Sequence, residues 1–150
     1  MRLRDFFTPG AISFDLQATH KDEALAEMVR LLGVDPRAAD TLLRVLQRRE
    51  SVGSTGFGRG IAIPHCRSLV ARRLRIAYGQ SRKGVDYDAI DGRPVHHVFL
   101  IVAPPLEISN QYLPVLGRIA QFAKEPDVPE RLSALGSPEE FFRLLEEKGV

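Results

Sequence analysis

A glycine-rich stretch that leads into a histidine is the part of the chain best suited to chemistry. Four glycines fall within residues 53–60, and the apolar run 61–63 separates them from Pro64 and His65. Glycine permits positive φ and close backbone approach, so such a loop can turn its N–H groups toward an anion. Since Pro64 cannot donate to a sheet ladder, the short buried strand should end there and present His65 beside the loop.

The residue types around His65 favour phosphoryl chemistry. A neutral imidazole is nucleophilic near neutral pH and can take a phosphoryl group onto a ring nitrogen. Such a site needs fixed donors for the phosphoryl oxygens and a nearby cation. The hydroxyls of Ser54 and Thr55, loop N–H groups such as that of Gly56, and the Arg49 guanidinium meet this need. We interpret His65 as the phosphoacceptor, Arg49 as a catalytic residue beside it, and Ser54, Thr55 and Gly56 as phosphate-binding residues.

A nucleotide site and a metal site are other interpretations of this motif. Arg59-Gly60 stands where a P-loop requires Lys-Ser/Thr, and the loop precedes a strand, which disfavours a Rossmann nucleotide site. Neighbours on a strand point to opposite faces, so His96 and His97 do not chelate one ion together, and we expect no metal. A plain tight turn between helix and strand, with a structural His65, remains the alternative.

Composition excludes several classes of protein. A chain of 150 residues with 44% hydrophobic and 27% charged residues fits one globular domain, 1–150. It has no apolar stretch long enough to insert into a membrane, and its one cysteine fits the reducing cytoplasm. The net charge of +2 is too small to argue for nucleic acid. The arginines at 67, 72, 73 and 75 lack interleaved aromatics, so we expect a solvated face or a docking surface for an acidic partner.

Helical periodicity and capping residues predict two adjacent helices in the first third of the chain. The first should begin at Thr19, with Asp22 completing a capping box, and end at Gly33. The second should begin at Asp35-Pro36 and run to about residue 48 or 49. Both are amphipathic, so they should pack together on one side of a sheet.

Strand patterns dominate the middle of the chain and helices its end. Residues 74–78 alternate like a half-buried strand, and the apolar run 95–102 suits a central strand buried on both faces. Ser109 should cap a helix whose apolar face includes Leu113, with Pro114 in its first turn. Ser137 should cap a last helix closed by Gly149. Interleaved strands and helices predict an α/β domain with helices on both sheet faces.

Residues 49–65 resemble the signature of the fructose/mannitol-type enzyme IIA domains of the bacterial phosphoenolpyruvate-dependent phosphotransferase system. The resemblance extends to residues 19–25, 87–95 and 98–101, and so covers nearly the whole chain. The free-standing length, with no fused IIB, IIC or HPr-like segment, is similar to the nitrogen-regulatory (Ntr-type) members.

The resemblance implies a three-layer α/β/α sandwich with a mixed, roughly five-stranded sheet. It places His65 at the family's phosphorylated histidine and Arg49 at its active-site arginine, with no cofactor. The implied donor is phosphorylated HPr or its Ntr counterpart. The implied acceptor or partner is a IIB domain or a regulatory target.

Two residues depart from the family pattern. Tyr112 stands where the family usually has a second active-site histidine, and Cys66 stands where many members have Gly or Ala. In the first turn of its helix, Tyr112 should lie within reach of His65 as a neutral hydrogen-bond donor. The departure at Tyr112 leaves a second hypothesis open: a regulatory binding module with weak or no phosphotransfer.

Overall fold

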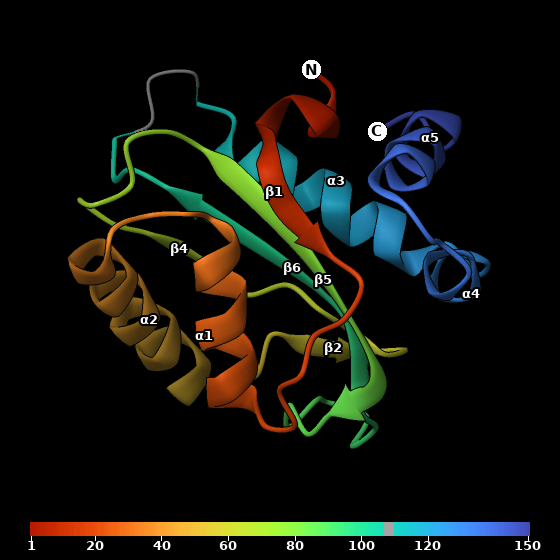
Figure 1. The fold of residues 1–150 in the computed structure, drawn as a ribbon, viewed down its shortest axis with the longest axis horizontal. Helices are drawn as coiled ribbons and strands as arrows, with labels where there is room; N and C mark the ends of the chain where they lie inside the picture. Colours follow the sequence, from red (N-terminus) through yellow and green to blue (C-terminus); the bar gives the residue numbers. More distant parts are fainter. Residues whose placement is uncertain (107–109) are drawn as a thin grey trace.

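Two groups of helices enclose a mixed sheet in the computed structural model, which describes residues 1–106 and 110–150 (Figure 1). In chain order the elements are η1 (Leu3–Phe6), β1 (Phe7–Ser13), α1 (Lys21–Leu31), α2 (Pro36–Ser51), β2 (Gly56–Gly58), β3 (Ile61–Ala62), β4 (His65–Arg67), β5 (Arg75–Val85), β6 (Val95–Ala103), α3 (Tyr112–Lys124), α4 (Val128–Ser133) and α5 (Pro138–Glu147). Helices α1 and α2 cover one face of the sheet, and α3, α4 and α5 lie on the other. This is the predicted three-layer α/β/α arrangement.

The sheet has the order β1-β5-β6-β3-β2, with β4 also paired to β6. Strands β3 and β4 lie one after the other along the same edge of β6, where Ala62 pairs with Val98 and His65 with Ile101. Pro64 interrupts them because it has no N–H to donate, although its carbonyl still accepts from the Ile101 N–H at 3.0 Å. The main order therefore has the five strands expected, and the short β4 beside β3 makes six.

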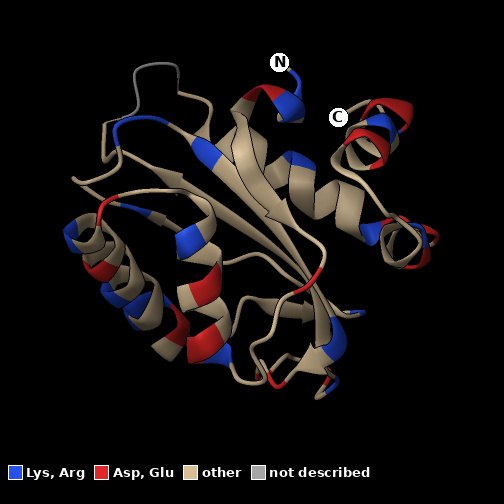
Figure 2. Ribbon diagram, viewed as in Figure 1, with Lys and Arg blue, Asp and Glu red and all other residues tan. Residues whose placement is uncertain are grey.

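A hydrophobic core fills each side of the sheet. Charged residues lie on helices, on loops and near strand ends, whereas the middle of the sheet is uncharged (Figure 2). The apolar run of β6 is buried on both faces, as predicted. The expectation of a half-buried strand at 74–78 was wrong, because helices cover both faces and β5 is buried from Ile76 to Ser81.

Most predicted helix ends are confirmed. The Asp35 side chain accepts a hydrogen bond from the Ala38 N–H at 2.9 Å, and Ser137 caps α5 by accepting from the Glu140 N–H at 3.2 Å. The Thr19 capping box was wrong. The Thr19 carbonyl accepts from the Asp86 N–H at 2.8 Å, which holds this segment extended, so α1 begins only at Lys21.

Helix α3 differs in detail from its prediction. The predicted Ser109 cap lies outside the described residues, and the helix begins at Tyr112, with Pro114 in its first turn as expected. Leu113 was predicted to face inward, but it is 65% exposed, and Tyr112 faces inward in its place. Helix α4 was not predicted, because six residues are too few to show a helical period.

Candidate functional site

His65 is the first residue of β4 and is half-buried. Because successive strand residues point to opposite faces, Cys66 enters the core under α1 and α2 while His65 faces the α3 side. Burial raises the pKa of the Cys66 thiol to about 12, so this group stays protonated and unreactive near neutral pH. Cys66 therefore serves as packing, which leaves His65 as the candidate nucleophile of β4.

One ring nitrogen of His65 is already engaged. Its Nδ1 lies 2.7 Å from the carbonyl oxygen of Ile63, and a carbonyl oxygen can only accept. Nδ1 therefore carries the proton, and Nε2 holds the lone pair. The Ile63 peptide is itself held by the glycine-rich loop, since its N–H donates to the Thr55 carbonyl at 3.0 Å. The loop thus fixes both the orientation and the tautomer of His65.

Tyr112 lies beside His65, as expected, with ring centroids 6.4 Å apart. Burial raises the pKa of its phenol to about 12, and the neighbouring Cys66 adds to this, whereas the charges of Arg67 and Arg49 oppose it. The phenol is therefore neutral at neutral pH and can donate a hydrogen bond but not a positive charge. Tyr112 is held there by α3, whose inward face it begins.

Arg67, which the sequence placed only in a basic cluster with the arginines at 72, 73 and 75, lies at the candidate site. Its guanidinium carbon lies 4.5 Å from the centroid of the Tyr112 ring, which is a cation–π contact. Arg67 follows His65 by two residues in β4, so strand alternation puts both on one face. That spacing was the available signal, but it becomes informative only once residues 65–67 are known to be a strand.

Arg49 lies in the last turn of α2 and is half-buried. Its guanidinium donates to the Gly53 carbonyl at 2.8 Å, and its charge acts on the Tyr112 hydroxyl across the site. The charges of two arginines from different elements, Arg49 from α2 and Arg67 from β4, therefore act on Tyr112. This positive charge suits a dianionic phosphoryl group.

The three residues expected to bind phosphate make their hydrogen bonds within the protein. Ser54 donates to the Tyr87 carbonyl at 3.2 Å and accepts from the Gly56 N–H at 3.1 Å. The Thr55 hydroxyl donates to the Glu50 carboxylate, which also accepts the Thr55 N–H at 3.0 Å. In this structure the three residues therefore shape the loop, because the Ser54 and Thr55 hydroxyls and the Gly56 N–H already make hydrogen bonds within the protein.

Glu50 joins the loop to α2 and α1. Its buried carboxylate accepts from Thr55 and from the Tyr87 hydroxyl at 3.3 Å, and Lys21 pairs with it at 3.3 Å. Burial raises the pKa of the Tyr87 phenol, and the Glu50 charge adds to that, so Tyr87 stays a donor. Gly56 is needed here because a Cβ would lie 3.0 Å from the Ala89 side chain.

Arg59 connects the same loop to α3. Its φ of 60° is in the left-handed region, at the turn between β2 and β3. Its guanidinium donates to the carbonyls of Ala123, Lys124 and Glu125 at 3.1, 2.7 and 2.8 Å, which satisfies the free carbonyls at the end of α3. The helix that carries Tyr112 is thus anchored at its far end by the loop that orients His65.

Residues 1–106 and 110–150 contain no group of three or more His, Cys, Asp or Glu side chains placed to hold a metal ion. No helix in these ranges is both long and apolar enough to cross a membrane.

Comparisons with known proteins agree with this geometry. Residues 5–148 match the family described as phosphoenolpyruvate-dependent sugar phosphotransferase system, EIIA 2. The chain is 32% identical over 147 residues to a nitrogen regulatory protein of Pseudomonas aeruginosa, covering 97% of this chain and 95% of that protein. The crystal structure of nitrogen regulatory protein IIA-Ntr from Neisseria meningitidis superposes with a TM-score of 0.84 at 28% identity, covering 94% of this chain and 97% of that one.

A longer relative is the fructose-specific EIIABC component of Bacillus subtilis (strain 168), which is 32% identical over 134 residues. That alignment covers 88% of this chain but only 21% of the relative, so the chain spans about a fifth of that protein. The family match covers nearly all of the chain, and the fold agrees with it. The chain belongs to the EIIA 2 family of the phosphoenolpyruvate-dependent sugar phosphotransferase system.

Proposed function

We propose that the chain is a phosphocarrier in which Nε2 of His65 accepts a phosphoryl group from a phosphorylated HPr-type carrier. The observation that carries this proposal is the hydrogen bond from Nδ1–H to the Ile63 carbonyl, which leaves the Nε2 lone pair free. That lone pair attacks phosphorus while the donor's own N–P bond breaks and its electron pair returns to the donor imidazole. The ring gains positive charge as the new N–P bond forms, and the Ile63 carbonyl dipole stabilises it.

Three neighbours are proposed to hold the phosphoryl oxygens. Arg49 and Arg67 supply the positive charge, and Tyr112 supplies a neutral O–H donor. Ser54, Thr55 and Gly56 act by holding the loop, and a role in binding phosphate directly would require their present hydrogen bonds to exchange.

Exposed apolar side chains adjoin the site in sequence, with Val52 81% exposed just after α2 and Leu113 next to Tyr112. Such side chains suit transient docking of a protein donor or acceptor.

The donor is proposed to be phospho-HPr or an Ntr-type HPr in the cytoplasm. The acceptor is a IIB domain or a regulatory target whose binding depends on the phosphorylation state of His65. The nitrogen-regulatory name of the Pseudomonas aeruginosa relative, which matches over nearly its whole length, favours the regulatory role. A second candidate is a regulatory binding module with weak or no phosphotransfer, because Tyr112 cannot provide the positive charge of a second histidine.

Incubation with phosphoenolpyruvate, enzyme I and an HPr-type carrier tests the proposal. Intact-mass measurement should show one added phosphoryl group, labile in acid and stable in base, as expected of an N–P bond. His65→Ala should abolish the adduct, and His20→Ala, which removes an exposed histidine, should keep it. An adduct that persists on folded His65→Ala would refute the assignment. A wild-type protein that gains no mass while the carrier is phosphorylated would favour the binding module.

A further inference from the structure

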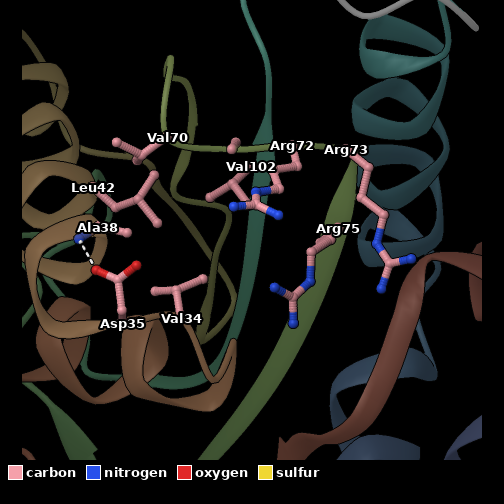
Figure 3. A pocket seen from close by; sticks show the side chains of 10 residues that line it. Val34, Asp35, Ala38, Leu42, Val70, Arg72, Arg73, Arg75 and Val102 are labelled. Carbon is pink, nitrogen blue, oxygen red and sulfur yellow. Dashed lines mark hydrogen bonds between the residues drawn. The ribbon is translucent and has the colours of Figure 1, made fainter.

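A pocket of about 380 Å³ lies on the α1/α2 side of the sheet, and the phosphocarrier proposal does not use it (Figure 3). Its walls come from the start of α2, from the loop after β4, and from the adjoining ends of β5 and β6. Val102 lines the pocket. It pairs with Cys66 on the neighbouring strand β4, and both side chains belong to the core under α1 and α2. His65 points to the opposite face, so the pocket and the His65 site are separate.

One half of the pocket is apolar. Leu42 and Val102 are 1% and 2% exposed, and Val34 and Val70 pack against the same core. In Figure 3 Val34 and Leu42 stand on one side of the pocket, with Val70 above them. A ligand that replaced water at these surfaces would gain from burial of its own apolar part.

The other half of the pocket is cationic. Arg72 and Arg75 lie across from Val34 and Leu42 in Figure 3, while Arg73 points away from them. Among the lining residues that the structure describes, the only carboxylate is that of Asp35, which is already engaged in capping α2 through the Ala38 N–H. Positive charge at the pocket therefore exceeds negative charge, which favours an anionic ligand.

Arg75 adds an unsatisfied donor. Its Nη2 donates to the Thr8 hydroxyl at 2.9 Å and to the Leu32 carbonyl, but its buried Nε–H has no hydrogen-bond partner within residues 1–106 and 110–150. Burial lowers the pKa of this guanidinium, and the charge of Arg73 lowers it further. An anion bound in the pocket would offset both the burial and the repulsion.

We propose that this pocket binds a small carboxylic acid with an aliphatic chain, with the chain against Leu42, Val34 and Val70 and the carboxylate toward Arg72 and Arg75. The volume is at the lower end of the range for small-molecule sites, roughly 300–1,000 Å³. The apolar half accounts for the chain, and the guanidinium groups match a carboxylate in charge and in hydrogen-bonding geometry. The inference depends on the pocket alone and stands or falls independently of phosphorylation at His65.

Three probes separate the two halves of this prediction. Octanoate carries chain and carboxylate, octylamine carries the chain with a cation, and acetate carries the carboxylate alone. In ¹H–¹⁵N NMR titrations, octanoate should give saturable single-site shifts centred on residues 34–42 and 70–75. Acetate and octylamine should each bind at least about tenfold more weakly, because each lacks one of the two interactions. Octylamine binding as tightly as octanoate, or octanoate shifts centred on His65, would overturn the proposal.

Two variants test the two halves in the protein. Ala38→Leu fills the pocket from α2 while leaving every charge in place, and should abolish octanoate binding. Arg72→Gln removes an exposed guanidinium without touching the core, and should weaken octanoate binding roughly 10-fold. The matched control is Arg82→Gln, which removes an exposed arginine elsewhere on β5 and should bind like the parent. Unaltered octanoate affinity in folded Ala38→Leu would contradict the proposal.

Discussion

The carbonyl oxygen of Ile63 lies 2.7 Å from Nδ1 of His65 and thereby determines which ring nitrogen is available for chemistry. The two residues are separated by Pro64, which lies between β3 and β4, and the imidazole is turned back toward the Ile63 carbonyl. The contact joins a side chain to a backbone carbonyl two residues earlier in the same segment. Substitution of other side chains at the site should therefore change the rate of phosphoryl transfer but leave His65 protonated on Nδ1.

Tyr112→Phe removes one hydroxyl and keeps the buried ring. If the phenol donates to a phosphoryl oxygen, the variant should lose its phosphoryl group faster, by hydrolysis or by transfer. The loss in stabilisation of the phosphorylated form should be about 1.5–3 kcal/mol at most. The measurement is the decay of the phosphorylated mass at fixed pH. Tyr112→His should speed onward transfer to a IIB-type acceptor. A Phe variant with unchanged decay would show that Tyr112 is packing only.

Arg67→Gln should slow phosphoryl transfer to His65. The change removes a charged contact to the phosphoryl group, worth roughly 1.5–3 kcal/mol, or about 10- to 100-fold in rate. Arg67 is exposed and its loss should leave the fold intact. Rapid-quench transfer from a phosphorylated HPr-type carrier measures the effect, with Arg82→Gln as the control for loss of one positive charge. Equal rates for both variants would exclude Arg67 from the site.

The Glu50 carboxylate should be a major source of stability for the loop. Glu50→Gln leaves the Lys21 charge without its buried partner and weakens the bonds from Thr55 and Tyr87. We expect a loss of about 3 kcal/mol in the free energy of unfolding. Urea denaturation measures it, and Glu23→Gln, an exposed substitution on α1, should cost little. A loss for Glu50→Gln no larger than that for Glu23→Gln would contradict this account of the loop.

His97 should make stability depend on pH. Burial, with a further contribution from the neighbouring His96, lowers its pKa to about 4, and the Pro129 backbone opposes the shift. Gln80 donates to the Tyr78 hydroxyl at 3.0 Å, so that hydroxyl is left to donate to Nδ1 of His97 at 2.8 Å, which suits the neutral ring.

Unfolded His97 takes up a proton near pH 6.5, whereas the folded form does so only near its lowered pKa. Stability from this group is therefore present at pH 7 and is lost as pH falls from about 6.5 toward 4. The expected loss between pH 7 and pH 5 is about 2 kcal/mol. Urea midpoints should show this slope in the parent and in His20→Gln, but a much weaker one in His97→Gln. An identical slope in His97→Gln would assign the effect to other groups.

Much of this architecture could be predicted from local sequence. Two helix starts are determined by caps whose partners lie within a few residues, at Asp35-Pro36 and at Ser137-Pro138. The run 95–102 is apolar enough to indicate a central strand. Helix α4 has no such signal. The predicted Thr19 cap does not form because the Thr19 carbonyl accepts a hydrogen bond from Asp86, which lies 67 residues later in the chain.

The site was predicted less completely, because its hydrogen bonds depend on distant residues. The sequence identifies Ser54 and Thr55 as hydroxyl donors but does not say that Tyr87 and Glu50 accept from them. Arg67 joins His65 only through the alternation of a three-residue strand. The pocket at Arg75 combines three separate segments of the chain, 34–42, 70–75 and Val102, and has no local sequence signature.

The most direct test of the account is the identity of the nitrogen that carries the phosphoryl group. Protein labelled with ¹⁵N-histidine and phosphorylated through enzyme I and an HPr-type carrier can be examined by ¹H–¹⁵N correlation through the imidazole ring. We predict a single phosphohistidine, at residue 65, with phosphorus on Nε2 and with Nδ1 still hydrogen-bonded to the Ile63 carbonyl. Phosphorus on Nδ1, or on a histidine other than His65, would contradict it.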